Sequence, residues 1–150
     1  MKRLFFILVS FLIMLNSCGI IKAPEEEGYP YSIELNKYEI LKDYEGNDIL
    51  VLDFLWKNNG ETSTRYFETF DIEVYQNGVE LESTYLILKE GRNEYQQSYK
   101  DQGAKIKPEI EIEVSDFYIL RDGINNIEII VYPVKWVTKD ALYHKTITIN

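Results

Sequence analysis

Few side chains in this sequence could carry out chemistry, and the two most reactive types occur once each. The chain of 150 residues has one cysteine, Cys18, and one histidine, His144. Zinc or copper sites built from clustered Cys and His are therefore excluded by count, and no serine stands in the context of a hydrolase nucleophile. His144 begins the last predicted strand, HKTITIN, and we interpret it as a solvated edge residue. The sequence predicts a protein that is not an enzyme and carries no cofactor.

Cys18 ends an apolar stretch near the N-terminus. A Lys-Arg pair at 2–3 precedes residues 4–15, which are apolar apart from one serine, and this is the pattern of a signal peptide. The stretch is shorter than the about 20 residues that span a bilayer. Leu15-Asn16-Ser17-Cys18 resembles a bacterial lipobox, and the resemblance implies that Cys18 carries diacylglycerol and palmitate. A plain secretory signal with a free thiol, or a permanent span, is the alternative.

Residues 18–30, CGIIKAPEEEGYP, form a short polar segment that cannot bury enough apolar surface to fold alone. We therefore expect a signal peptide at 1–17, a flexible tether at 18–30 and one domain at 31–150. The lipid would hold this domain at the extracytoplasmic face of a bacterial membrane. The formal net charge of −9 opposes binding to nucleic acid, whose phosphates need Lys and Arg. We expect a monomer.

Carboxylates are abundant, so a hard cation is the metal to test. Asp43, Glu45 and Asp48 in KDYEGND resemble part of a calcium loop but lack its twelve-residue pattern and terminal glutamate. A polar hairpin turn explains the same residues more simply, so the three residues are kept as a candidate cation turn and no metal site is predicted. A second acidic set alternates with apolar residues at 109–113, where lysines on a neighbouring strand would satisfy it.

A polar run at 89–103, KEGRNEYQQSYKDQG, is the candidate recognition loop. Most of the twelve tyrosines suit strands, but Tyr95 and Tyr99 lie in this run without apolar neighbours, and Arg92 precedes them. Tyrosine is enriched at binding surfaces, and long connections in compact domains are often functional. The alternative is an ordinary connection that is mobile or partly stranded.

Beyond the tether, apolar residues recur with the period of strands. Strands are predicted at 31–41, 49–58, 84–88, 109–119, 126–134 and 144–150, and Pro133 should end the strand at 126–134 or mark an edge. In 70–83, Asn77-Gly78 separates two short runs and predicts a type I′ hairpin turn. No apolar run of helical period exceeds about two turns. Seven or eight short strands predict an all-β, antiparallel sandwich of immunoglobulin type.

Four segments resemble a known family: WKNNGETST, VYQNGVELE, KIKPEIEIEV and the strand that ends in VYPV. Over about residues 30–135 they resemble the immunoglobulin-like domain of unknown function carried by small Firmicute lipoproteins, distant relatives of telokin-like secreted antigen domains. The family usually turns with Pro-Gly before the Glu-rich strand, whereas this chain has Pro108-Glu109. Lys22 followed by 25–27, EEE, also resembles a surface-export tag of Bacteroidetes lipoproteins. The resemblance implies fold and location, and no activity.

The leading hypothesis is a lipid-anchored, non-catalytic binding module with an envelope protein or glycan as partner. The first alternative is a solute- or cation-binding lipoprotein that uses the turn at 43–48. The second is an enzyme that acts on envelope polymers.

Overall fold

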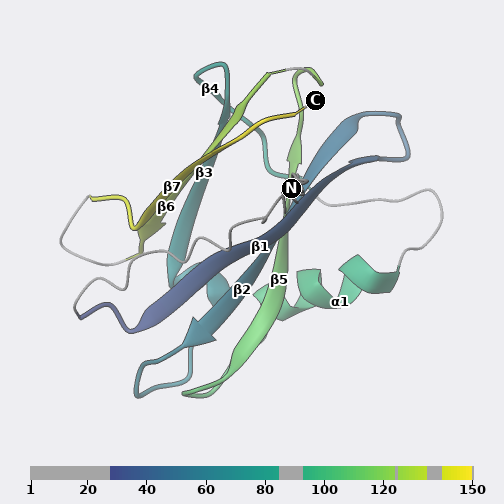
Figure 1. Cartoon of the computed structure of the whole chain (residues 1–150). Helices are drawn as coiled ribbons and strands as arrows, with labels where there is room; N and C mark the ends of the chain where they lie inside the picture. Colours follow the sequence, from purple (N-terminus) through teal and green to yellow (C-terminus); the bar gives the residue numbers. More distant parts are fainter. Residues whose placement is uncertain (1–27, 85–92, 124, 135–139, 150) are drawn as a thin grey trace, which may run out of the picture.

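The computed structural model describes residues 28–84, 93–123, 125–134 and 140–149, and within them it is an antiparallel β-sandwich (Figure 1). One sheet has the strand order β1-β2-β5 and the other β4-β3-β6-β7. The bounds are β1 Tyr31–Lys42, β2 Asp48–Asn58, β3 Phe70–Gln76, β4 Val79–Glu80, β5 Glu111–Ile119, β6 Ile127–Pro133 and β7 Tyr143–Ile147, with a 3₁₀ turn η1 at Tyr66–Glu68 and a helix α1 at Asn93–Gln102. Every strand pair is antiparallel. The predicted immunoglobulin-like sandwich is confirmed.

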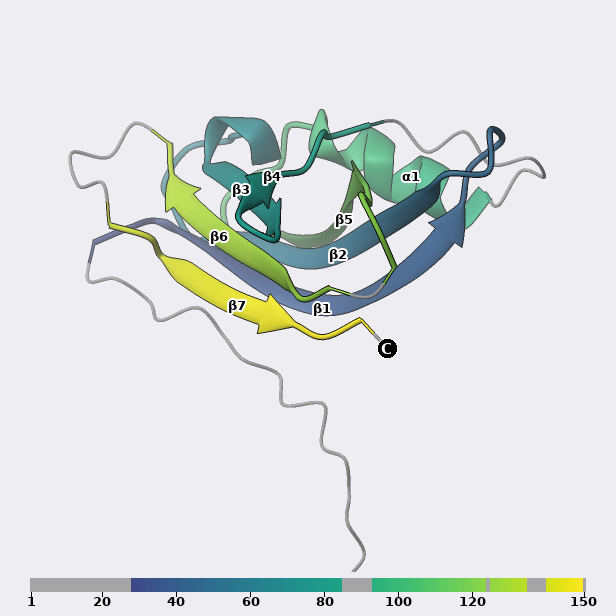
Figure 2. The same cartoon turned by 90° about the horizontal axis from the view of Figure 1, so that it is seen from above.

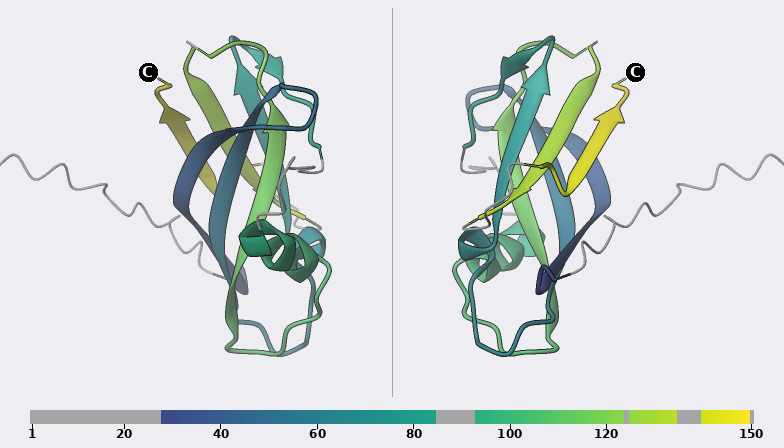
Figure 3. Two further views of the ribbon diagram at one scale, coloured as in Figure 1. Left: turned by 90° about the vertical axis from the view of Figure 1, so that its right-hand side faces the viewer. Right: turned by 90° about the vertical axis from the view of Figure 1, so that its left-hand side faces the viewer.

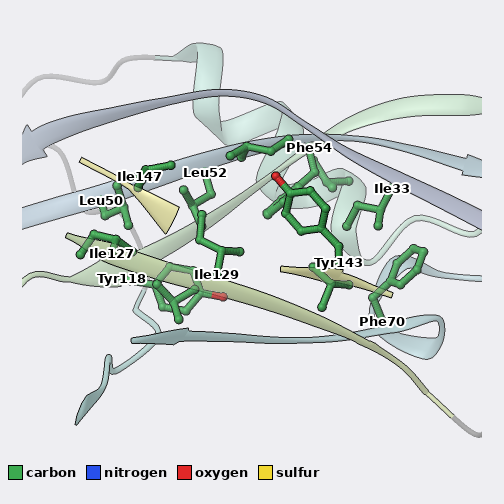
Figure 4. Close-up of a cluster of buried hydrophobic side chains, with 14 of the residues drawn as sticks. Ile33, Leu50, Leu52, Phe54, Phe70, Tyr118, Ile127, Ile129, Tyr143 and Ile147 are labelled. Atoms are coloured by element: carbon green, nitrogen blue, oxygen red, sulfur yellow. The ribbon is translucent and has the colours of Figure 1, made fainter. Parts of the chain in front are cut away.

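The main core lies between the two sheets, because alternate residues of each strand point to the opposite sheet. Leu52 and Phe54 from β2 face Ile127 and Ile129 from β6, and all four side chains are inaccessible to solvent (Figure 4). Seen from above, the two sheets curve around this core (Figure 2). We call the side of each sheet that faces the other sheet its inner face.

The hairpin at Asn77-Gly78 confirms the predicted turn. Asn77 has φ 53° and Gly78 has φ 71°, which are the positive values that a type I′ turn requires at both central residues. Gln76 pairs with Val79 on either side of the turn. The sequence signal was reliable here because Asn and Gly tolerate this conformation better than other residues.

The turn at Pro108-Glu109 places a glutamate where the family usually has glycine. Glu109 has φ 64°, in the left-handed region that favours glycine. Its backbone N–H donates to the carbonyl of Asn58 at 2.7 Å, and the N–H of Asn58 donates to the carbonyl of Ile110 at 3.0 Å. These two bonds hold the turn against the start of β5, so the chain accepts an unfavourable backbone conformation at this point.

Helix α1 is the longest element that the sequence did not predict. It packs against the outer face of the β1-β2-β5 sheet, crossing β5 (Figure 3). Tyr95 from the helix joins Ile49, Val51 and Phe117 in a second, smaller apolar cluster. The expected loop at 89–103 is therefore wrong over 93–102, because the helix is stabilised by packing onto a sheet and not by an apolar stripe of its own.

Two other boundaries differ from expectation. Tyr29, assigned to the tether, packs on the main core with its ring 5.7 Å from that of Phe70. In the predicted strand 84–88, Thr84 lies next to an isolated bridge between Ser83 and Tyr118, and 85–88 lies outside the described residues. The predicted signal peptide at 1–17 and the tether as far as residue 27 also lie outside them. Pro133 ends β6 as predicted.

Candidate functional site

A pocket of about 310 Å³ lies at the edge of β5 that does not pair with β2. The chain segment 82–84 runs along part of this edge, where the N–H of Thr84 donates to the carbonyl of Phe117 at 2.9 Å. Helix α1 closes another side with Tyr99 and Gln102. We call this hollow the β5-edge pocket; its described lining residues are Ser83, Thr84, Tyr99, Gln102, Asp116, Phe117 and Tyr118.

Asp116 is the carboxylate of the β5-edge pocket. Ile112, Val114 and Asp116 are alternate residues of β5, so all three point to the inner face of the sheet. A charged group therefore lies in a row that otherwise supplies core residues. The hydroxyl of Tyr66 donates to Oδ2 at 2.8 Å, and Nε2 of Gln102 donates to Oδ1 at 2.6 Å. Both donors are neutral, so they satisfy hydrogen bonds without balancing the charge.

Burial raises the pKa of Asp116 to about 6, because removing water disfavours the charged carboxylate. The hydrogen bond from Tyr66 opposes this rise in pKa, and the nearby carboxyl group of Asp53 adds to it. None of the salt bridges among the described residues involves Asp116. A half-buried carboxylate in a pocket, with no cation beside it among the described residues, is the kind of group found at functional sites.

A different carboxylate, Asp53 of β2, lies on the outer face of the same sheet. It is 1% exposed and accepts a hydrogen bond from the Ser115 hydroxyl. Nζ of Lys37 lies 3.1 Å from its Oδ2. We call Lys37, Asp53, Ser98 and Ser115 the Asp53 cluster; Ser115 and Ser98 are 2.7 Å apart at their hydroxyl oxygens.

A β-bulge supplies the cation of the Asp53 cluster. The pairing of β1 with β2 shifts between Leu35 and Lys37, so that Leu35 pairs with Phe54 and Lys37 with Asp53. The extra residue moves Lys37 onto the outer face, beside the carboxylate. Nζ of Lys37 also lies 5.6 Å from the centre of the Tyr95 ring. The hydrogen bond to Asp53 raises the pKa of Lys37, so the ammonium form is favoured.

The structure separates the three residues of the predicted recognition loop. Tyr95 is 5% exposed and packs edge-on against Phe117, so its expected outward orientation is wrong. Tyr99 is 38% exposed and lines the β5-edge pocket. Arg92 lies outside the described residues. The helix turns the two tyrosines to the same side, but only one of them reaches solvent.

The acidic turn does not bring its carboxylates together as the cation-binding hypothesis requires. Asp43 accepts two hydrogen bonds from Asn47, through the backbone and the side chain, each at 2.8 Å. These bonds hold the pKa of Asp43 below its ordinary value. Asp48 pairs with Lys42 at 2.6 Å, and Glu45 is exposed. Across the described ranges, no group of three or more His, Cys, Asp or Glu side chains could hold a metal ion.

The remaining candidates have ordinary surroundings. His144 is exposed on the edge strand β7, as predicted, and its Nε2 lies 2.6 Å from Oε1 of Glu128. In the acidic set at 109–113, Glu109 pairs with Lys57 at 3.4 Å, in line with the expected lysine partner, whereas Glu113 accepts a hydrogen bond from Asn36. Cys18 lies outside the described residues.

Sequence reasoning missed Asp116 and Gln102, although signals for both were present. Asp116 interrupts the inward row of β5, and a carboxylate in a core row calls for an explanation. Gln102 belongs to the set Tyr95, Ser98, Tyr99 and Gln102, which has the spacing i, i+3, i+4, i+7 of one helix face. All four of these residues carry polar groups, so a search for apolar residues at helical spacing does not detect this face.

In the part of the chain that the structure describes, no helix has both the length and the apolar character needed to span a membrane.

Three solved structures share the fold. A "putative lipoprotein" of Staphylococcus aureus superposes with a TM-score of 0.62 at 13% identity, covering 81% of this chain and 85% of that one. A protein from Enterococcus faecalis gives 0.59 at 17% identity, with coverages of 81% and 86%. A "putative lipoprotein" of Bacillus subtilis superposes with a TM-score of 0.52 at 12% identity. That match covers 81% of this chain and 37% of the Bacillus subtilis chain. At these identities the likeness establishes the fold alone.

No curated protein matches the sequence. A family model does match it, over residues 22–133, and its description is Domain of unknown function (DUF5067). The match covers most of the chain, including β1 through β6 and α1. The expected resemblance to an immunoglobulin-like domain of unknown function in Firmicute lipoproteins is thereby confirmed, and this chain belongs to the DUF5067 family.

Proposed function

We propose that this protein is a lipid-anchored, non-catalytic binding module at the extracytoplasmic face of a bacterial membrane, and that the β5-edge pocket is its ligand site. The anchor is Cys18, whose context LNSCG follows a basic pair and an apolar run. Two structural neighbours with the same fold carry the word lipoprotein in their names, which supports this location. Two acyl chains on one residue provide the double signal that stable anchoring needs.

The proposed binding function rests on one observation, the carboxylate of Asp116 at a core-facing position beside a pocket. A neutral residue at this core-facing position would avoid the cost of burying a charge. The chain instead keeps a carboxylate there and opens a pocket onto it. Natural proteins accept such costs where a side chain serves a function. A ligand that completes the surroundings of Asp116 would recover part of the lost stability.

A binding role fits the pocket better than catalysis. Acid–base chemistry usually needs a second titratable group within reach of the substrate. Asp116 is the one acid or base among the described lining residues whose pKa lies near neutral, and each of its oxygens already accepts a hydrogen bond. His144 is exposed on β7 in the other sheet, paired with Glu128. The proposed partner is an envelope protein or glycan, or a small solute, that reaches the pocket.

Location is tested by replacing the anchor. Cys18→Ser should abolish labelling of the full-length protein by a palmitate analogue in a bacterial host and should leave the precursor uncleaved. The wild-type protein should be labelled and should be digested by protease added outside intact cells or spheroplasts. Equal labelling of wild type and variant would contradict the anchor at Cys18.

Binding through the pocket is tested by site-specific photo-crosslinking in the lipidated protein. A crosslinking residue at Ser83, which is exposed at the pocket, should give discrete adducts whose masses identify envelope ligands. The matched control position is Thr146, which is exposed on β7 at the far edge of the other sheet. Adducts that are the same from both positions, or absent from both, would contradict the pocket as the ligand site.

A further inference from the structure

The β5-edge pocket has the composition of a site for a positively charged organic group. Three of its described lining residues, Tyr99, Phe117 and Tyr118, are aromatic. Two others, Ser83 and Thr84, carry hydroxyls, and one is a carboxylate. None of the seven described lining residues is cationic. The combination of a carboxylate with aromatic rings is the one that proteins use to hold ammonium groups.

Asp116 has room for one more partner. A carboxylate offers about four acceptor positions on its two oxygens. In this structure Tyr66 occupies one position on Oδ2 and Gln102 occupies one on Oδ1. Their geometry fixes the orientation of the carboxylate, and no cation among the described residues compensates its charge. A cation in the pocket would supply a charge-assisted hydrogen bond, which is stronger than a neutral one.

We propose that the β5-edge pocket binds an organic cation, a primary or alkylated amine, whose ammonium group forms an ion pair with Asp116. This inference rests on the binding function proposed above and names its ligand class. The carbon chain of the amine lies against the aromatic residues of the wall. Anionic ligands are disfavoured twice, by Asp116 itself and by the formal net charge of −9.

The size of the pocket restricts the ligand further. A volume of about 310 Å³ is near the lower end of the range, roughly 300 to 1,000 Å³, that ligand pockets occupy. A small free amine fits this volume, and so does the amine-bearing end of a larger envelope molecule. A folded protein surface or a long oligosaccharide would have to enter through such an end group.

Binding of an ammonium group has a consequence for proton affinity. Tyr66 of η1 and Tyr118 of β5 face Asp116, and burial raises the pKa of both hydroxyls well above their ordinary value, so both stay neutral below pH 8. Asp53 of β2 is already paired with Lys37, and Gln102 of α1 does not titrate. The amine therefore selects the ionised form of Asp116 alone. Affinity for the amine should rise as the pH increases through about 6 and then level off.

The test uses the full chain in non-ionic detergent and phosphate buffer, with 1,5-diaminopentane as the probe and 1,5-pentanediol as its uncharged counterpart. Carboxyl-detected NMR follows Asp116, and amide shifts follow residues 116–118. The diamine should bind saturably and the diol roughly 10-fold more weakly or not at all. A tenfold preference for the ionised form should lower the pKa of Asp116 by about one unit.

Two variants make the result specific. Asp116→Asn is expected to fold and should remove the preference for the diamine over the diol. Glu82→Gln removes an exposed carboxylate on the segment that borders the pocket, and it should change the affinity for the diamine by less than about twofold, because exposed charges are screened.

Each contrary outcome has a defined meaning. Equal binding of diamine and diol, unchanged in Asp116→Asn, would overturn the ligand class while leaving the pocket a binding site. Absence of any diamine-dependent shift at Asp116 and 116–118 would also overturn the ligand class. The proposed binding function fails only if crosslinking from Ser83 gives no pocket-specific adduct as well.

Discussion

Two carboxylates on neighbouring strands of one sheet, one buried and one half-buried, have opposite surroundings. Asp53 on the outer face is 1% exposed, and the fold brings the ammonium group of Lys37 to 3.1 Å from it. Asp116 on the inner face has two neutral hydrogen-bond donors and a pocket beside it. In the register, Asp53 pairs with Ser115, the residue that precedes Asp116. A shift of one position along β5 thus separates a charge that Lys37 compensates from one that no described cation compensates.

The fold supplies a cation to Asp53, whereas among the described residues it supplies none to Asp116. Burying an ion costs several kcal/mol unless a partner offsets it. For Asp53 the β-bulge in β1 provides that partner, and helix α1 covers the pair. For Asp116 no described residue provides a cation, which is why we propose a ligand in the pocket beside it. Variants of the residues around each carboxylate test this difference through the stability of the fold.

The helix residue that covers the Asp53 cluster should matter most for stability. Tyr95→Ala removes a buried ring that packs on Phe117 and lies near Lys37. We expect the free energy of unfolding to fall by about 3 kcal/mol or more, as for other buried aromatic truncations. Tyr99→Ala, one turn along the helix and 38% exposed, should cost less than about 1 kcal/mol. Urea unfolding of both variants measures the contrast, and similar losses would contradict it.

The strands and hairpin were predictable from the sequence because their signals are local. The alternation in 109–119 and the pair Asn77-Gly78 determine conformation over a few residues, and tertiary packing agrees with them. Helix α1 was not predictable in this way. Its mean character is polar, and Tyr95 is buried only because Ile49 and Val51 of a distant strand offer it a surface. The expectation of an exposed loop failed for that reason.

The candidate site was predictable in part. The inward placement of Asp116 follows from the parity of β5 and needs no structure. Its pocket does not follow, because it depends on Gln102 from the unpredicted helix and on the pairing of 82–84 with the edge of β5. The β-bulge that brings Lys37 to Asp53 could not be predicted from the sequence either, because a one-residue shift of register has no clear signature in residue composition. Tyr99 was chosen for its residue type and does line the pocket.

Breaking the Asp53 pair should expose the cost that Lys37 offsets. Lys37→Met leaves a fully buried carboxylate with Ser115 as its donor. We expect a loss of about 2 kcal/mol at pH 7, below the usual loss of roughly 3–5 kcal/mol for a buried pair, because the Lys37 side chain is 53% exposed.

Two controls accompany Lys37→Met. Adding Asp53→Asn should restore most of the stability, because the charge and its partner are then both absent. Lys42→Met breaks an exposed pair with Asp48 and should cost less than about 1 kcal/mol. If the double variant were no more stable than Lys37→Met, the loss would come from packing of the lysine stem and not from the charge.

Neutralising Asp116 should have the opposite sign. The folded pKa of about 6 lies above the ordinary 3.8, so the neutral carboxyl stabilises the fold below pH 3.8 and this contribution is lost as the pH rises to about 6. Asp116→Asn should therefore be more stable than wild type by about 1–2 kcal/mol at pH 7. The advantage should fall toward zero near pH 3.5. This value allows for water that enters the pocket and lowers the cost of the charge.

Chemical unfolding of Asp116→Asn and wild type at a series of pH values measures this difference. Asp71→Asn, an exposed acid on β3, is the control and should be within about 0.5 kcal/mol of wild type throughout. If Asp116→Asn were less stable than wild type at pH 7, the fold would require the charge of Asp116 as it requires that of Asp53. The proposed difference between the two carboxylates would then be wrong.

The smallest expected effect concerns Gln102, the helix residue that joins the two carboxylate regions. Its Nε2 donates to Oδ1 of Asp116 at 2.6 Å and also to the carbonyl of Ser115. Gln102→Met removes both hydrogen bonds, so we expect a loss of about 1 kcal/mol at pH 7 and a pKa of Asp116 above that in wild type, because a donor to the ionised form is lost. At pH 4 the part of the loss that comes from the bond to Asp116 should disappear, and the part that comes from the bond to the Ser115 carbonyl should remain. Gln97→Met is the matched control, since Gln97 is exposed on the same helix and donates to Asp101 at 2.8 Å. Carboxyl NMR titration gives the pKa, and an unchanged value in Gln102→Met would mean that Tyr66 alone orients Asp116 in the pocket.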